Sequence, residues 1–270
     1  MEGENSPYLM EHGEEILRLE MKTDPEVLRK QACWCGVAPG LRVLDAGCGP
    51  GKTSAILHGM VLPEGRVLGV DASPERIRHA EARYGGDGLS FLVHDWATPL
   101  QDVEPFDLIW VRFVLEYNRR GSFRIVRNLS DCLRPGGTLC LMDLDHNGLN
   151  HYELPREMEA VIKELMGRLE RDHDFDPYAG RKLYAHLYDL GYEEIEVALT
   201  AHHLIYGPLR EEDAFNWIKK LEVVSSKTAQ VLDRYPGGRE RFMSDFKTFF
   251  THPRRFTYTP LISCKGVKPG

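Results

Sequence analysis

Between about residue 41 and residue 145, short apolar runs alternate with stretches in which apolar residues recur at helical spacing. The apolar runs predict strands at Leu41–Ala46, Arg66–Val70, Leu89–His94, Phe106–Val111 and Thr138–Leu144. Strands that alternate with helices are typical of a parallel sheet joined by crossover helices. The pattern therefore predicts an α/β fold in this part of the chain.

Helical spacing also precedes and follows this block. The helical stretch between the last two expected strands is longer than a usual turn, so we expect it to form a cap or lid. The further helices are expected at Glu11–Met21, Pro25 to about Gly36, Leu154–Leu169, Arg181–Leu190, Glu211–Asp233 and Arg239–Phe250, and the further strands at Tyr192–Thr200 and Phe256–Cys264.

Residue types that start and stop helices mark two elements inside the block. Ser73 places a capping hydroxyl before Pro74, and proline is favoured at the first helical position. The stretch Arg119–Leu133 is expected to be a helix, and the Arg134–Gly137 sequence that follows combines a helix stop with a turn.

Composition places the chain among globular proteins with a substantial core. Of 270 residues, 42% are hydrophobic and 28% are charged, and the net charge is −7. This balance excludes a disordered tail, a collagen-like repeat and a disulfide-rich miniprotein. The acidic charge argues against a nucleic-acid partner, because general nucleic-acid binding needs Lys and Arg to neutralise phosphates.

Cysteine spacing and the absence of long apolar runs bear on the compartment. The six cysteines are dispersed without the paired spacing of a structural zinc site, so we expect no metal, and we expect Cys33 and Cys35 to be buried free thiols. The first residues lack the basic and apolar regions of a signal peptide. The apolar run LIWVRFVL is short and contains Arg112. We therefore expect a cytoplasmic protein without a membrane partner.

The densest chemical signal is the segment Val43–Thr53, in which an apolar strand runs into three glycines at alternate positions. Glycine lets the backbone turn tightly and approach a ligand without an intervening side chain. A helix that opens directly after such a loop presents unpaired N–H groups. The segment therefore predicts a loop that binds a nucleotide or nucleoside.

Two chemistries compete for this loop. From Ala46 onward it is similar to a phosphate-binding loop, in which Lys52 and Thr53 would serve phosphate and magnesium, and Asp143 could pass for the second metal-binding element. Asp45 argues against this, since an acid directly beneath the loop would repel a triphosphate. A dinucleotide-binding loop also fits poorly, because it would need glycine at Lys52.

The acid and glycines at Asp45, Gly47, Gly49 and Gly51 resemble the first motif of class I S-adenosylmethionine-dependent methyltransferases. The cofactor of that family has no phosphate and carries a positive sulfonium and ammonium, so an aspartate beneath the loop favours it. Asp71 ends the second strand about 20 residues beyond the glycines, the spacing at which a carboxylate accepts from ribose hydroxyls. Later segments also match the family's pattern: His94–Trp96, Phe106–Val111 and Leu133–Leu139.

The resemblance implies a Rossmann-like, doubly wound sheet of seven strands, mostly parallel, with an antiparallel final strand. It also implies S-adenosyl-L-methionine as cofactor, and the best-matching branch is the small-molecule group that includes ubiquinone/menaquinone-biosynthesis-type enzymes. In this family Asp95 would accept from the adenine amino group, and Trp96 could flank the adenine ring. The cofactor-binding residues implied or favoured by position are Asp45, Gly47, Cys48, Gly49, Gly51, Asp71, Ala72, Asp95, Trp96, Val111, Arg112, Tyr8 and Arg18.

The acceptor is expected to be a small molecule. Amino-methylating DNA enzymes carry an Asn/Asp-Pro-Pro-aromatic tetrad after the fourth strand, where this chain has Val111–Val114. Arg112 could contact the methionine end of the cofactor or an acidic substrate. The preferred candidates for a general base are His146 and His151, which follow the fifth strand. A phosphate-loop nucleotide hydrolase and a catalytically silent cofactor-binding regulatory protein are the alternative functions.

The domain organisation that we expect has three parts. Residues 1–36 form an N-terminal helical cap segment. Residues 37–204 and 255–270 form the S-adenosylmethionine-binding core, with a helix at 153–170 directed toward the cap. Residues 205–254 form a helical insertion that covers the substrate, since ligands of open α/β sheets bind beyond the carboxyl ends of the strands. A homodimer is compatible with this organisation.

Overall fold

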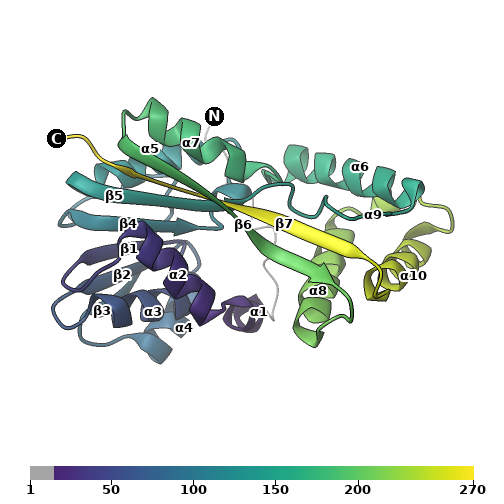
Figure 1. Cartoon of the computed structure of the whole chain (residues 1–270), viewed down its shortest axis with the longest axis horizontal. Coiled ribbons are helices and arrows are strands. Elements are labelled where there is room, and N and C mark those ends of the chain that lie inside the picture. The colour runs from purple at the N-terminus through teal and green to yellow at the C-terminus, as the bar shows by residue number, and fades with distance from the viewer. Residues whose placement is uncertain (1–14) are drawn as a thin grey trace.

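One seven-stranded sheet organises the computed structural model, which describes residues 15–270 (Figure 1). The strands are β1 (Arg42–Ala46), β2 (Arg66–Asp71), β3 (Leu89–Val93), β4 (Phe106–Arg112), β5 (Leu133–Leu144), β6 (Glu193–Tyr206) and β7 (Phe256–Val267). Their order is β3-β2-β1-β4-β5-β7-β6, and β7 runs antiparallel to both of its neighbours. The other neighbouring pairs are parallel. The expected doubly wound α/β sheet is therefore confirmed.

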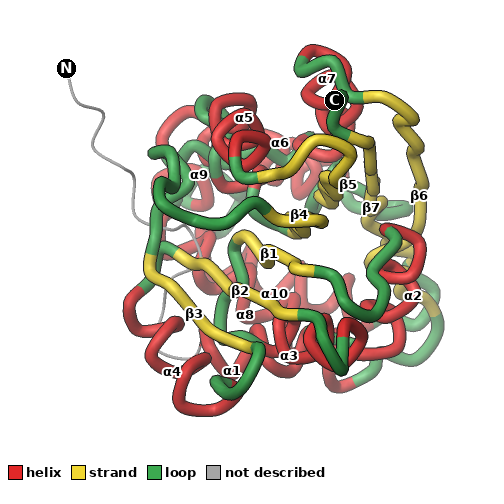
Figure 2. The backbone as a smooth tube through the Cα atoms, turned by 90° about the vertical axis from the view of Figure 1, so that its left-hand side faces the viewer, coloured by secondary structure: helices red, strands yellow, loops and turns green. Residues whose placement is uncertain are grey.

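The helices lie on both faces of this sheet and beyond one of its edges, as Figures 1 and 2 show. Local sequence explains several helix ends: Asp24 accepts from the N–H groups of Glu26 and Val27, and Gly36 ends the same helix with a φ of 90°. The helices are α1 (Glu15–Lys22), α2 (Pro25–Cys35), α3 (Lys52–Val61), α4 (Pro74–Tyr84), α5 (Ser122–Asp131), α6 (Arg156–Asp172), α7 (Leu183–Asp189), α8 (Glu211–Lys227), α9 (Ala229–Leu232) and α10 (Gly238–Thr251), with short 3-10 turns η1 (Leu115–Tyr117) and η2 (Ala179–Lys182).

β4 shows how the sheet is buried on both faces. Leu108 and Trp110 belong to an apolar core shared with α2 and α3. Ile109 and Val111 belong to a second core shared with α5 and α7. A strand that is covered on both faces has a continuous apolar sequence instead of an alternating one, which is why β4 could be recognised without its structure.

A third apolar core lies beyond the carboxyl ends of the parallel strands. It joins Leu165 of α6, Trp217 of α8, Phe246 and Phe250 of α10, and Ile205 near the end of β6. We call α6, α8, α9 and α10 the cap. Figure 1 shows that β6 and β7 project past the other strands to reach these helices.

Two helical segments differ from the sequence prediction. The helix expected over Arg119–Leu133 ends at Asp131, and the expected turn after it is part of β5. The N–H of Gly136 donates to the carbonyl oxygen of Lys268 (2.9 Å), so pairing with the last residues extends the strand through a sequence of turn composition. The stretch Glu211–Asp233 is two helices, because Thr228 leaves the helical conformation with a φ of −131°.

The structure also bears on the expectations for the cysteines and for the N-terminal residues. Cys33 is exposed while the other five cysteines are buried, and all six are free thiols, which corrects the expectation of a buried Cys33. The expected helix Glu11–Met21 is described from Glu15 onward, and Tyr8 lies outside the described residues. Within residues 15–270, no cluster of three or more His, Cys, Asp and Glu side chains could hold a metal ion. No helix in that range is long and apolar enough to cross a bilayer.

Candidate cofactor pocket

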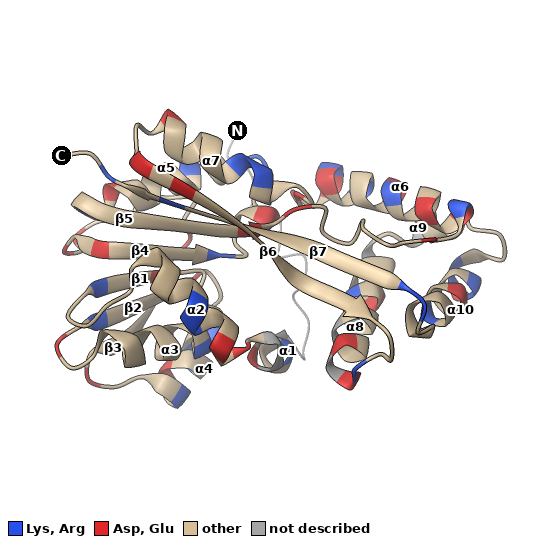
Figure 3. Ribbon diagram, in the orientation of Figure 1, with Lys and Arg blue, Asp and Glu red and all other residues tan. Residues whose placement is uncertain are grey.

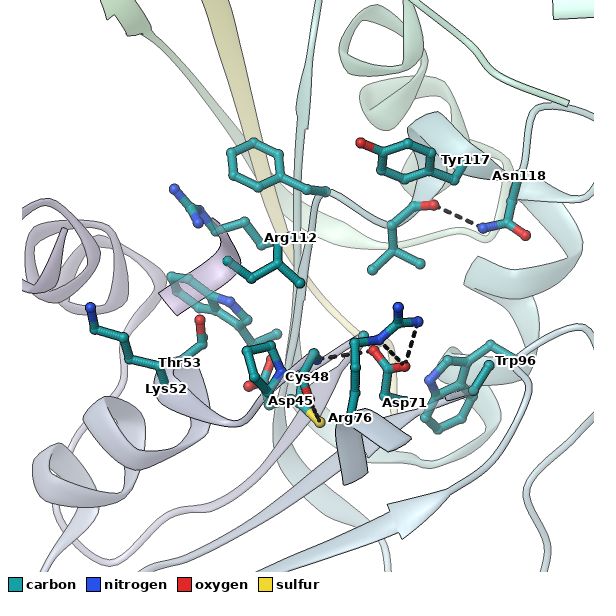
Figure 4. Close-up of a pocket in the computed structure, with 18 of the residues that line it drawn as sticks. Asp45, Cys48, Lys52, Thr53, Asp71, Arg76, Trp96, Arg112, Tyr117 and Asn118 are labelled. Carbon is teal, nitrogen blue, oxygen red and sulfur yellow. Dashed lines mark hydrogen bonds and ion pairs between the residues drawn. The ribbon is translucent and has the colours of Figure 1, made fainter. Parts of the chain in front are cut away.

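A cavity of about 260 Å³ opens where β1, β2 and β4 end (Figure 4). The glycine loop after β1 forms its floor, and residues that follow β2, β3 and β4 form its walls. From the cap side, α1 contributes Arg18 and Leu19, and His173 follows the end of α6. Residues from distant parts of the sequence thus meet at the carboxyl edge of the sheet, as expected for a ligand site in an open α/β fold.

The glycine loop can take its path only because side chains are missing. Gly47 has a φ of 79°, and a Cβ atom placed on it would lie 2.3 Å from a methyl group of Val114. Gly51 has a φ of 94° directly before α3, and no side chain caps the N-terminus of that helix. The N–H groups of Gly47, Cys48 and Gly49 donate to β2, to the carbonyl oxygen of Val70 or to the carboxylate of Asp71. The loop therefore offers the cavity close-lying backbone where its glycines have no side chain.

Asp45 ends its strand beneath the loop and is 2% exposed. Its carboxylate accepts a hydrogen bond from Ser54 Oγ at 2.6 Å. Burial raises the pKa of Asp45 to about 7, an effect that the nearby Asp71 reinforces and that Ser54 and Arg112 oppose. A cationic ligand in the cavity would favour the ionised carboxylate, whereas a polyphosphate would oppose it.

Asp71 ties the end of β2 to the glycine loop. One carboxylate oxygen accepts from the N–H of Gly49 (3.0 Å), and the other accepts from the N–H of Ser73 (2.9 Å). Arg76, in the first turn of α4, donates to the second oxygen through Nε at 3.0 Å and forms an ion pair with it. Sequence reasoning found Asp71 but missed Arg76, which lines the same cavity.

The loop after β3 supplies the far wall. Asp95 lines the cavity, and one of its oxygens accepts from the N–H of Ala97 (2.9 Å). Trp96 also lines the cavity, but most of its ring packs in the core beneath the sheet, where it is 5% exposed. The backbone oxygen of Trp96 accepts from Asn128 Nδ2 (3.0 Å), which fixes the loop to α5.

Arg112 ends β4 and lines the cavity. Burial lowers its pKa to about 10, against the raising effect of Asp45 and Asp143. Its guanidinium lies 4.1 Å from the ring centre of Phe113, and its buried Nε has no hydrogen-bond partner among the described residues. Phe113 has a φ of 60°, so the strand turns sharply after Arg112. A guanidinium with an unused donor is suited to an anionic group of a ligand.

Lys52 does not turn toward the loop. Its Nζ donates to the backbone oxygen of Glu20 in α1 (2.5 Å) and so attaches the first turn of α3 to that helix. Asp143 accepts from the N–H groups of Leu115 and Glu116 and therefore holds η1 in place. A phosphate-binding loop would need this lysine on the phosphates and this acid on the metal, so both contacts argue against that alternative.

Comparison with known proteins also indicates a methyltransferase fold. A model of the methyltransferase domain matches residues 43–137. A trans-aconitate 2-methyltransferase from Methylobacterium nodulans is 32% identical over 145 residues, which cover 54% of this chain and 49% of that protein. One from Streptomyces coelicolor is 28% identical over 213 residues, covering 76% of this chain and 67% of that protein. A methyltransferase from Thiobacillus denitrificans, solved with S-adenosylhomocysteine, aligns over 96% of both chains with a TM-score of 0.56 and 17% identity.

Residues 43–137 have the sequence of a methyltransferase domain, and the described chain has the fold of S-adenosylmethionine-dependent methyltransferases. The resemblance that the motifs indicated is thereby confirmed. The chain spans about half the length of the Methylobacterium relative, at 49%. The matched family segment ends before η2 and the helices α6–α10, so the match does not extend to the cap.

Most of the cofactor-binding residues predicted from the sequence line the cavity. Gly51 and Val111 stand next to lining residues without lining the cavity themselves, and Tyr8 lies outside the described residues. The proposed residues that do line the cavity are Asp45, Gly47, Cys48, Gly49, Asp71, Ala72, Asp95, Trp96, Arg112 and Arg18.

Neither candidate base lies among the residues that line the methyltransferase cavity. His146 contacts Asp145 through Nδ1 (3.0 Å), and Arg181 binds the same carboxylate with two hydrogen bonds. His151 is enclosed by aromatic rings of the cap, with Trp217 at 5.3 Å, and its Nδ1 contacts Thr257 Oγ1 at 2.8 Å. Burial lowers the pKa of His151 to about 4.

Several lining residues on the cap side were missed, among them Leu19 of α1. Tyr117 and Asn118 follow β4 in η1 and just beyond it, and the carboxyl-edge rule could have found them from the sequence. His173 comes after α6, and nothing in its local sequence marks it.

The cap is attached to the region near η1 by a chain of hydrogen bonds. Lys220 Nζ donates to Asn147 Oδ1 (2.9 Å), and Asn147 Nδ2 donates to Glu116 (2.6 Å).

Proposed function

We propose that this protein transfers a methyl group from S-adenosylmethionine to a small-molecule acceptor. The observation that carries the proposal is the cavity, in which the glycine loop meets Asp71, Asp95 and Arg112 at the carboxyl edge of a methyltransferase sheet. Two acids and an arginine suit a nucleoside that bears an ammonium and a carboxylate. The same groups would serve a polyphosphate poorly.

In this proposal, each lining residue binds one part of the cofactor. Asp71 accepts from the ribose hydroxyls, and Asp95 and Trp96 hold the adenine. Arg112, with Arg18 of α1, takes the methionine carboxylate through charge-assisted hydrogen bonds. Asp45 supports the positive end of the ligand. The cofactor supplies an electrophilic methyl sulfonium when bound, and the protein supplies alignment.

The acceptor would enter from the cap side of the cavity, past Tyr117, Asn118 and His173. Two of the most similar relatives are named for trans-aconitate, a small molecule, which supports an acceptor of that size. Closure of the region between α1 and the cap would exclude water from the transfer. We propose a small-molecule reaction in the cytoplasm, without nucleic-acid or membrane partners. The ubiquinone-type branch, and His146 or His151 as base, stay predictions.

Calorimetry and a turnover assay test the proposal together. We expect S-adenosylhomocysteine to bind and magnesium ATP not to bind. Release of S-adenosylhomocysteine is then followed with a panel of small carboxylic acids, amines, thiols and phenols, and we expect turnover with at least one class. Binding of magnesium ATP without binding of S-adenosylhomocysteine would support the hydrolase alternative. Cofactor binding without turnover across the panel would support a silent cofactor-binding protein.

A further inference from the structure

The projecting halves of β6 and β7 have an exposed apolar face. Leu204 lies opposite Tyr258, and Tyr206 lies opposite Phe256, so these four side chains share one side of the ribbon. Leu199, opposite Ile262, continues the same side along β6. We call this side the outer face. Its six large apolar side chains are between 41% and 70% exposed: Tyr152, Leu199, Leu204, Tyr206, Phe256 and Tyr258.

The other side of the same ribbon is fully covered. Thr257 and Thr259 are 0% exposed, and Ile205 packs into the aromatic core of the cap. A bridge between His151 and Thr257 places His151 on this covered side, so the adjacent Tyr152 belongs to the outer face. Figure 1 shows α8 and α10 behind the ribbon and no described element in front of it. At Ile262 the same side of β7 is covered by η2. Beyond that point the outer face lacks a covering element among the described residues.

The outer face is also free of charge. Residues 197–206 and 256–264 contain no Asp, Glu, Lys or Arg, as the uninterrupted tan of this part of Figure 3 shows. The charged groups lie at the rim, where Arg254 is paired with Glu153. An apolar centre with a polar rim is the arrangement of protein–protein interfaces. A surface without charge can meet an identical surface without placing like charges against each other.

The exposed area is sufficient for a specific contact between two copies. Six side chains of roughly 200 Å² that are about half exposed present about 600 Å² per chain. Two such faces in contact would bury about 1,200 Å² in total, which reaches the range of specific interfaces. An apolar patch of this size is at the upper end of what a typical monomer exposes, and such patches are often functional.

We infer that a second copy of this chain covers the outer face, so that the protein forms a two-fold symmetric homodimer through β6 and β7. In such an interface the same residues of both copies meet, and the two ribbons pack face to face as in a sheet sandwich. The glutamates at the start of β6, Glu193, Glu194 and Glu196, lie outside the patch and remain in solvent.

Multi-angle light scattering and sedimentation equilibrium of the full chain test this inference. We expect the unsubstituted protein to have twice the monomer mass. The double variant Leu204→Lys/Tyr206→Lys is expected to raise the dimer dissociation constant about 30-fold or more. Both side chains are at least half exposed, so the fold should survive, which circular dichroism and S-adenosylhomocysteine binding would verify.

A matched control is available on α7. Tyr184 and Tyr188 are 49% and 65% exposed, close to the 50% and 65% of Leu204 and Tyr206. Tyr184→Lys/Tyr188→Lys is expected to leave the dimer intact. A monomeric parent protein would overturn the inference. This outcome would mean that another protein or another segment of the same chain covers the outer face. A dimer that both double variants leave unchanged would overturn it too.

Discussion

At the residue scale, the cavity is defined by charged groups whose partners come from other elements. Asp71 could be found from the sequence because its spacing from the glycines follows from the βαβ unit. Arg76 could not, because an arginine in a first helical turn is common on surfaces, and only the packed structure shows it against Asp71. His151 looked available for catalysis because the aromatic residues that enclose it come 66 or more residues later.

Asp71 should be more important for cofactor binding than its partner Arg76. Asp71→Ala removes the proposed ribose acceptor and the bond to the N–H of Gly49, so we expect S-adenosylhomocysteine to bind about 1.5–3 kcal/mol more weakly. Arg76→Ala leaves the carboxylate in place and should cost less. Calorimetry on both folded variants measures the difference. Equal losses would argue that the ion pair, and not the ribose contact, determines affinity.

Lys52 and Arg112 should behave in opposite ways. Lys52→Ala removes a contact to the backbone of α1 and no contact to the loop, so S-adenosylhomocysteine should bind within about twofold of the parent protein. Arg112→Met removes the guanidinium proposed for the methionine carboxylate and should weaken binding by about tenfold or more. Titration of both variants in one buffer checks the contrast. A large loss at Lys52 would be evidence for the phosphate-loop alternative.

At the element scale, β1 and β4 could be predicted because they are buried on both faces, and α2 and α4 could be predicted because they have local start signals. The start of β5 and the end of β6 could not be predicted from the local sequence. Gly136 belongs to a strand because of a bond to Lys268, which is far away in sequence. β6 runs to Tyr206 because β7 pairs with it and the cap supports it, whereas its alternation of polar and apolar residues predicted an end at Thr200.

Acid should destabilise the cap through His151. Its pKa is lowered to about 4 in the folded protein, against 6.5 for the free side chain, so the unfolded chain binds more protons between those values. The folding stability from neutral His151 is therefore present above about pH 6.5 and is lost as pH falls toward 4. Urea unfolding from pH 4 to pH 7 should show a smaller pH dependence in His151→Gln than in the parent protein. Parallel curves would contradict the assignment.

Ligand binding should protect the elements that border the cavity on the cap side. α1 places Arg18 and Leu19 on the cavity wall, and His173 follows α6. With S-adenosylhomocysteine bound, hydrogen exchange should slow in peptides of α1 and α6 as well as in the glycine loop. The α7 peptides, which pack on β5, β6 and β7 and contribute no residue to the cavity wall, serve as the internal control. Protection confined to residues 45–115 would exclude a lid.

At the scale of the whole molecule, the sheet and cap share the ligand cavity, and the acidic chain leaves one apolar face without charge. The sequence could predict the sheet and the existence of a helical insertion between the last strands. It could not place the outer face, since the expected strand stopped at Thr200 and the alternation changes its phase beyond it. The register shift between Ala201 and His203 produces that change, so Leu204 and Tyr206 share a side with Leu199.

β6 and β7 run without interruption from the sheet into the cap, and this continuity restricts how the two parts can move. A hydrogen-bonded ribbon belongs to both the sheet and the cap, besides the non-helical connection from β5 to α6. The weak point in the ribbon is the register shift at Ala201–His203, where the opposite strand carries Pro260, which has no N–H to donate. Displacement of the cap over the cavity is therefore a torsion of this ribbon about its own axis, and its amplitude is limited by the twist that the paired backbone tolerates.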